Sequence, residues 1–72
     1  MEIKVGVVGK VMDGKEVGRY VKVIDDESNT GGFLILTASS PKMQDGFDNW
    51  VENRQVLQLF FEEAGWIIEW DC

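Results

Sequence analysis

The chain has 72 residues, of which 13 are acidic and seven are basic, so its formal net charge is −6. A chain this short forms one domain with a small core, burying roughly 60 % of the surface that the unfolded chain would expose. We therefore expect a single α+β domain over residues 1–72. The negative charge opposes contact with nucleic-acid phosphates and with anionic membrane surfaces, so the sequence predicts neither as a partner.

Histidine is absent and Cys72 is the single cysteine, so the usual nitrogen and thiolate ligands of zinc and haem sites are missing. We expect no metal site and no cofactor. Acid–base chemistry would fall to carboxylates, which need a water-excluding pocket to separate their pKa values. A domain of this size has little volume for such a pocket beside its core, so we predict no enzyme and no catalytic residue.

The N-terminal residues and the apolar runs do not suggest targeting to a membrane. The first residues, Met1–Lys4, lack the charged and apolar regions of a signal peptide. The apolar runs are about five residues long, far short of the ~20 that span a bilayer. We predict a cytoplasmic protein.

Strand patterns fill the first part of the chain. Apolar residues alternate over residues 3–8, a period of two that indicates a strand. Asp13-Gly14 has the chemistry of a tight hairpin turn, and a returning strand is predicted over residues 17–25. Residues 33–37 predict a third strand with apolar side chains on both faces, which is typical of an interior strand.

The segment 25–32 between the second and third strands is acidic and glycine-rich, and its composition predicts a loop. Oxygens at Asp25, Glu27 and Asn29 imitate the first ligand spacings of a calcium-binding EF-hand loop. The sixth position is Thr30 where that loop requires glycine, and the twelfth is Leu36 where it requires glutamate. We expect a solvated turn, with weak ligand or cation binding as the alternative.

From Phe47 the apolar spacing becomes helical, and one stripe runs on to Ala64 if the helix is continuous. Arg54 would lie within that stripe. This misfit predicts either a break near Asn53-Arg54 or an arginine whose stem packs while its guanidinium reaches outward. Gly65 is placed to end the helix.

Residues 66–70 predict a closing strand, with Trp66, Ile68 and Trp70 on one face. The predicted order is β-β-β-α-β, an antiparallel sheet of about four strands with one helix packed on a face. The last strand must pair beside the first or the third strand to bury its tryptophans. We expect at least two of the three tryptophans to lie in the core.

The charge is distributed unevenly. Residues 1–42 carry six acids and six bases, whereas residues 43–72 carry seven acids and one base. On the predicted helix, apolar side chains rimmed by carboxylates resemble the composition of a protein contact. The candidate partner-binding residues are Asp48, Glu52, Val56, Leu59 and Glu63. The alternative is that a kink at Arg54 rotates the second half of the helix and buries Val56 and Leu59.

Three segments, with the pair Phe60-Phe61 between the second and the third, carry a resemblance to known proteins. The segments are Gly31-Gly32-Phe33-Leu34-Ile35, Phe47-Asp48-Asn49-Trp50-Val51-Glu52 and Trp66-Ile67-Ile68-Glu69-Trp70. Together they resemble a group of short acidic bacterial proteins, in which the first segment is a strand, the second a helix and the third a closing strand. In size and acidity the chain is similar to immunity proteins of polymorphic and contact-dependent toxin systems. The resemblance implies no particular contact residues.

These observations favour a non-catalytic protein-binding module whose partner has a basic surface. The resemblance implies, more narrowly, an immunity protein that covers the basic active-site cleft of a cognate toxin. Carboxylates would then occupy the place of substrate phosphates and speed capture electrostatically. The alternative from another class is a structural protein that forms a homodimer through an edge strand or through Val56 and Leu59.

Overall fold

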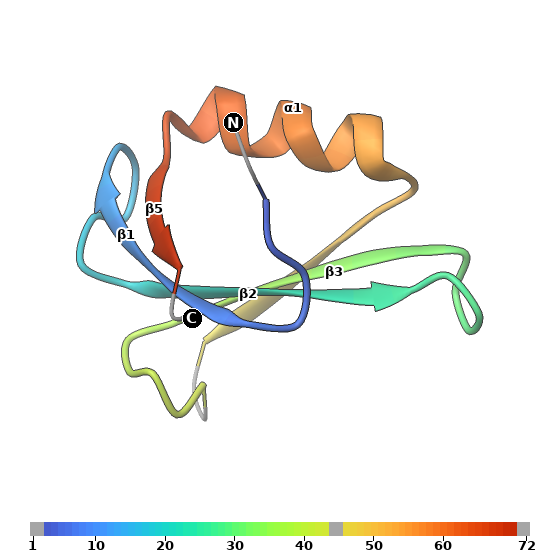
Figure 1. The fold of residues 1–72 in the computed structure, drawn as a ribbon, viewed down its shortest axis with the longest axis horizontal. Helices are drawn as coiled ribbons and strands as arrows, with labels where there is room; N and C mark the ends of the chain where they lie inside the picture. Colours follow the sequence, from blue (N-terminus) through green and yellow to red (C-terminus); the bar gives the residue numbers. More distant parts are fainter. Residues whose placement is uncertain (1–2, 44–45, 71–72) are drawn as a thin grey trace.

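The computed structural model describes residues 3–43 and 46–70, and within them five strands form one sheet that is crossed by one helix (Figure 1). The elements in chain order are β1 (Val8–Asp13), β2 (Tyr20–Asp26), β3 (Gly32–Ala38), β4 (Phe47–Val51), α1 (Arg54–Ala64) and β5 (Ile67–Trp70). The sheet order is β4-β3-β2-β1-β5, and all of its strand pairs are antiparallel. The predicted α+β class is confirmed, with one strand more than the four expected.

The core lies between the helix and one face of the sheet. The register places Val23, Ile35 and Val21 on that face, and all three are buried. Leu57 and Phe61 meet them from the helix. The N-terminal segment also runs along this side of the sheet (Figure 1), where its apolar side chains pack against the core.

The first strand lies later in the chain than its pattern predicts. β1 begins at Val8, and the residues before it form only a bridge, in which Val5 pairs in parallel with Val23. Asp13-Gly14 begins the connection to β2, as predicted, but β2 starts only at Tyr20. The hairpin is therefore a wide loop over residues 14–19. β3 lies between β2 and β4, which confirms its interior position.

The helix expected to begin at Phe47 begins seven residues later, at Arg54. Phe47–Val51 instead forms β4, an edge strand paired with β3. Its apolar residues, Phe47, Trp50 and Val51, lie at positions i, i+3 and i+4, which favours a helix. The pairing with β3, and not the local pattern, makes this segment a strand. Asn53 is extended, with φ −163°, and its side chain accepts a hydrogen bond from the Val56 amide at 2.9 Å. This N-cap marks the predicted break.

The remaining expectations for the C-terminal half hold. Arg54 lies at the first helical position, with its guanidinium carbon 5.5 Å from the centre of the Phe33 ring. Gly65 ends the helix in the left-handed conformation. β5 pairs with β1, which selects one of the two placements expected. Trp66 is buried and Trp70 packs against the core, whereas Trp50 is 51 % exposed.

Candidate functional site

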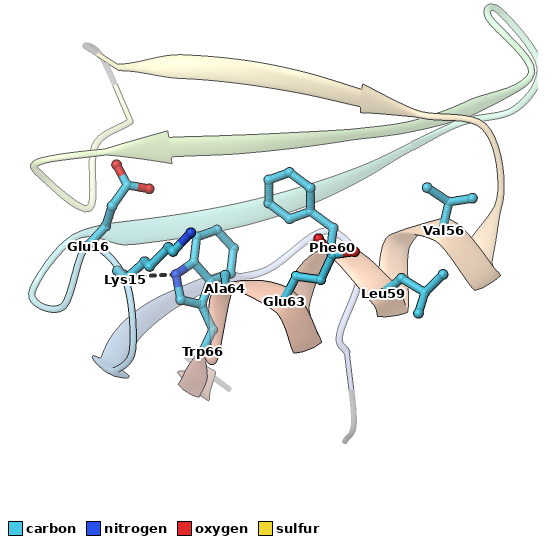
Figure 2. A pocket seen from close by; sticks show the side chains of 8 residues that line it. All are labelled: Lys15, Glu16, Val56, Leu59, Phe60, Glu63, Ala64 and Trp66. Atoms are coloured by element: carbon cyan, nitrogen blue, oxygen red, sulfur yellow. Dashed lines mark hydrogen bonds between the residues drawn. The ribbon is translucent and has the colours of Figure 1, made fainter.

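A groove of about 410 Å³ lies between helix α1 and the loop that joins β1 to β2 (Figure 2). Its lining combines apolar side chains with three charged ones: Val56, Leu59, Phe60, Ala64, Trp66, Lys15, Glu16 and Glu63. A cleft of this volume is within the range of ligand-binding sites. Two segments distant in the sequence form it together, so it depends on how the loop docks against the helix.

Hydrogen bonds hold that loop against the end of the helix. The Lys15 amide donates to the Ala64 carbonyl oxygen at 3.0 Å, and the Trp66 indole donates to the Lys15 carbonyl oxygen at 2.6 Å. Gly14 lies so close that a Cβ placed on it would be 2.2 Å from the Gly65 carbonyl oxygen. The helix end, whose last carbonyls lack partners within the helix, is thereby joined to the loop.

Helical spacing divides the side chains of α1 between the groove and the core. Leu57 and Phe61, four positions apart, are buried in the core. Val56, Leu59 and Glu63 lie on the adjoining side and line the groove, because residues three and four apart share one side of a helix. Leu59 remains 48 % exposed. The groove thus presents apolar surface that the fold itself does not cover.

The aromatic floor of the groove is fixed by its packing. Trp66 is only 2 % exposed, and its ring meets two phenylalanines edge to face. Ring centres are 5.7 Å apart for Phe60 and 5.0 Å apart for Phe61. Such aromatic pairs contribute beyond the area that they bury. A ligand would therefore meet a preformed surface, and little ordering of side chains would oppose its binding.

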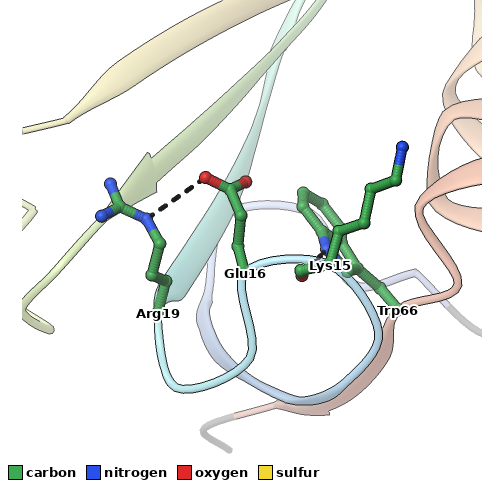
Figure 3. A network of polar contacts seen from close by, with 4 residues as sticks. All are labelled: Lys15, Glu16, Arg19 and Trp66. Carbon is green, nitrogen blue, oxygen red and sulfur yellow. Dashed lines mark hydrogen bonds and ion pairs between the residues drawn. The ribbon is translucent and has the colours of Figure 1, made fainter.

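The groove is lined by one base and two acids, Lys15, Glu16 and Glu63, and a basic group of a partner would suit the carboxylate that has no basic partner of its own. Arg19 Nε lies 3.5 Å from a carboxylate oxygen of Glu16 (Figure 3), so that carboxylate already has a basic partner. Glu63 forms no ion pair with any residue in the described part of the chain. An apolar side chain next to a lysine or arginine would suit this combination of apolar floor and acidic rim.

The structure brings together three of the five predicted partner-binding residues. Val56, Leu59 and Glu63 line the groove. Asp48 lies instead on β4, opposite Leu36 on the sheet face turned away from the helix, and Glu52 lies in the link before α1. The single acidic helix surface expected from the sequence is therefore wrong, because its first two members precede the helix. The alternative, that a break at Arg54 buries Val56 and Leu59, is right in part: Val56 is half-buried and packs against the core, whereas Leu59 is exposed.

Sequence reasoning missed the other residues that line the groove, among them Lys15, Glu16 and Phe60. Their position depends on the wide loop after β1 and on its contact with the helix end. The sequence contained one usable signal, the Asp13-Gly14 turn, which predicted a chain reversal next to these residues.

The turn between β2 and β3 uses its own oxygens. The Asp26 carboxylate accepts a hydrogen bond from the Thr30 hydroxyl at 2.9 Å, and Asp25 accepts one from the Glu27 amide at 3.0 Å. Among the described residues, no group of three or more acidic, cysteine or histidine side chains is placed to hold a metal ion. Cation binding by residues 25–32 therefore has no geometric support in this part of the chain.

Comparison with known proteins yields no relative. No family model matches the chain, and neither do any curated protein or solved structure. The resemblance to immunity proteins therefore stays a prediction. Within residues 3–43 and 46–70, α1 is too short and too polar to cross a membrane.

Proposed function

We propose that this chain is a non-catalytic protein-binding module that uses the groove beside α1 to hold a basic partner. The observation that supports it is the composition of the groove, in which the exposed Leu59 side chain leaves apolar surface uncovered close to the Glu63 carboxylate. Protein contacts typically combine an apolar centre with a polar rim. A partner side chain such as leucine or phenylalanine would occupy the floor, and a neighbouring lysine or arginine would meet Glu63.

The acidity of the whole chain supports a basic partner as well. A net charge of −6 on 72 residues attracts a positively charged protein over a distance and raises its association rate, and this effect weakens as salt is added. The narrower proposal is that the chain is a bacterial immunity protein whose partner is a toxin with a basic cleft. Its small size and its acidity support this narrower proposal.

The first test of the immunity role is a protection assay. The partner to be assayed is a toxin domain encoded next to the gene for this chain, co-expressed with the chain in a sensitive bacterium. The proposal predicts that the chain restores growth and that the purified proteins form a complex. A neighbourhood without such a toxin gene, or a toxin that the chain does not bind, would contradict the immunity role.

The second test asks whether the groove makes the contact. Glu63→Lys reverses a charge on the groove rim, whereas Glu62→Lys makes the same charge change at the adjacent residue. Glu62 does not line the groove but a neighbouring hollow, which shares only Leu59 with it. Association should slow about tenfold for the first variant and by much less for the second. Equal slowing would show that only net charge matters and that the groove is not the contact.

Homodimer formation, the alternative from the sequence, stays a prediction. Sedimentation at micromolar concentration tests it: a mass that is independent of concentration and equal to one chain would exclude it.

A further inference from the structure

We propose that the free edge of β4 binds an extended segment of a partner protein that carries two basic residues at alternate positions. This surface is separate from the groove beside α1, and the proposal does not depend on that groove. It concerns Phe47–Val51, which pairs with β3 on one side and is the outermost strand of the described sheet.

Within the part of the chain that the structure describes, two residues of β4 have backbone groups without a strand partner. Two close approaches show which residues bond across β3 and β4. A Cβ on Gly32 would collide with the Val51 carbonyl oxygen, and a Cβ on Gly46 would collide with the Thr37 carbonyl oxygen, so both oxygens point between the two strands. Val51, and with it Asn49 and Phe47 at alternate positions, therefore bonds to β3. In an antiparallel ladder the intervening residues face the other way, so Asp48 and Trp50 direct their N–H and C=O groups outward.

β4 lacks several of the usual protections of an edge strand. Proteins block such edges with short strands, charged side chains, proline, bulges or a covering element, and of these β4 has its short length and the Asp48 carboxylate. Phe47–Val51 contains neither proline nor lysine, and its register with β3 has no shift. Phe47 is 71 % exposed, and Trp50 and Asp48 are exposed too. A backbone edge with exposed apolar side chains is the surface to which extended peptides add as a further strand.

Charge and aromatic surface specify which segment fits. Asp48 and Trp50 point to the same sheet face, and Asp48 forms no ion pair with any residue that the structure describes. The Trp50 indole is held in place by a 2.9 Å hydrogen bond to Thr30 Oγ1. A strand added beside β4 would place one side chain opposite Asp48 and another opposite Trp50. Lysine or arginine at both positions would form an ion pair and a cation–π contact.

The same features disfavour a second copy of this chain as the occupant. A second copy would bring a net charge of −6 to this edge and add another Asp48 to the same short pair of strands. Like charges on neighbouring strands are destabilising. A basic partner strand has the opposite charge. The residues between its basic ones lie on the other face of the sheet, where Phe47 lies, and can be apolar to cover that side chain.

The test uses a capped seven-residue peptide of alternating arginine and valine, with a control in which glutamate replaces arginine. Amide hydrogen exchange of the whole chain is followed by NMR. At a peptide concentration ten times its dissociation constant, exchange at Asp48 and Trp50 should slow by about tenfold, since exchange then proceeds from the free fraction. The Asn49 amide, already bonded to β3, should change little.

Several results would overturn the proposal: unchanged exchange at Asp48 and Trp50, equal binding of the glutamate peptide, or protection of the same amides by self-association without peptide. Asp48→Lys should weaken the arginine peptide about tenfold and strengthen the glutamate peptide, and Asp48→Asn should give a smaller loss. Unaltered affinity in either variant would contradict the assigned role of Asp48. Leu59→Lys changes the groove and should leave peptide binding at β4 intact. A failure of the β4 proposal can therefore be told apart from a failure of the groove proposal.

Discussion

The indole of Trp66 reaches back 51 residues to donate a 2.6 Å hydrogen bond to the carbonyl oxygen of Lys15. This bond joins the loop after β1 to the residue that follows the helix, and both of its partners line the groove. The geometry of the groove therefore depends on a contact between the two ends of the sequence.

Trp66→Phe should lower the free energy of unfolding by about 2–4 kcal/mol, because it leaves the Lys15 carbonyl without its donor and removes buried volume. Trp50→Phe removes an equivalent indole donor at a site that is 51 % exposed, where water can replace it, and should cost less than about 1 kcal/mol. Urea denaturation measures both. Similar losses of unfolding free energy for the two variants would show that the Trp66 hydrogen bond stabilises the protein no more than the exposed Trp50 bond does.

A pair of glycine variants tests the contact between the loop and the helix end. Gly14 and Gly18 have nearly the same φ, +95° and +93°, but a Cβ on Gly14 would lie 2.2 Å from the Gly65 carbonyl oxygen and one on Gly18 would meet nothing within 4 Å. Both alanine variants should lose about 1 kcal/mol to backbone strain. Gly14→Ala should lose about 2 kcal/mol more, since the loop must move from the helix. Equal melting temperatures would contradict this packing.

Asn53→Ala tests where the helix begins. As the N-cap, Asn53 accepts a hydrogen bond from the Val56 amide, and its replacement should destabilise the protein by about 0.5–2 kcal/mol. In a helix that began at Phe47, Asn53 would be an interior residue and alanine would stabilise it. The sign of the change in urea denaturation therefore distinguishes the two structures.

The sequence was most informative where local chemistry decides the structure. The chain reversal after Asp13-Gly14, the break before Arg54 and the stop at Gly65 follow from residue types with strong backbone preferences. The reversal is a loop over residues 14–19, however, and not the tight turn expected. The Phe47–Val51 segment was misassigned because its apolar residues have helical spacing, and only pairing with β3 makes it a strand. Tertiary contact overrides local preference in such short segments.

The candidate site was predictable only in its helical part. Val56, Leu59 and Glu63 share a side of one helix, so spacing alone brings them together. Lys15 and Trp66 join them through long-range docking, which no local pattern encodes. Asp48, misplaced on the helix in the sequence analysis, turned out to lie on a second exposed surface, the edge of β4.

Two leucines of α1 should separate folding from binding. Leu57 is 1 % exposed and Leu59 is 48 % exposed. Leu57→Ala should cost about 2–5 kcal/mol through loss of buried contacts, whereas Leu59→Ala should change stability by less than about 1 kcal/mol. Chemical denaturation gives both values. A large loss for Leu59→Ala would mean that this side chain supports the core and is not available to a partner.

The central claim, that the groove beside α1 binds a basic partner, is tested most directly by comparing the association rates of Glu63→Lys and Glu62→Lys with the purified toxin domain. We predict that Glu63→Lys slows association about tenfold and that Glu62→Lys, outside the groove lining, retains most of the wild-type rate. Equal rates for the two variants, with both folded, would contradict the claim.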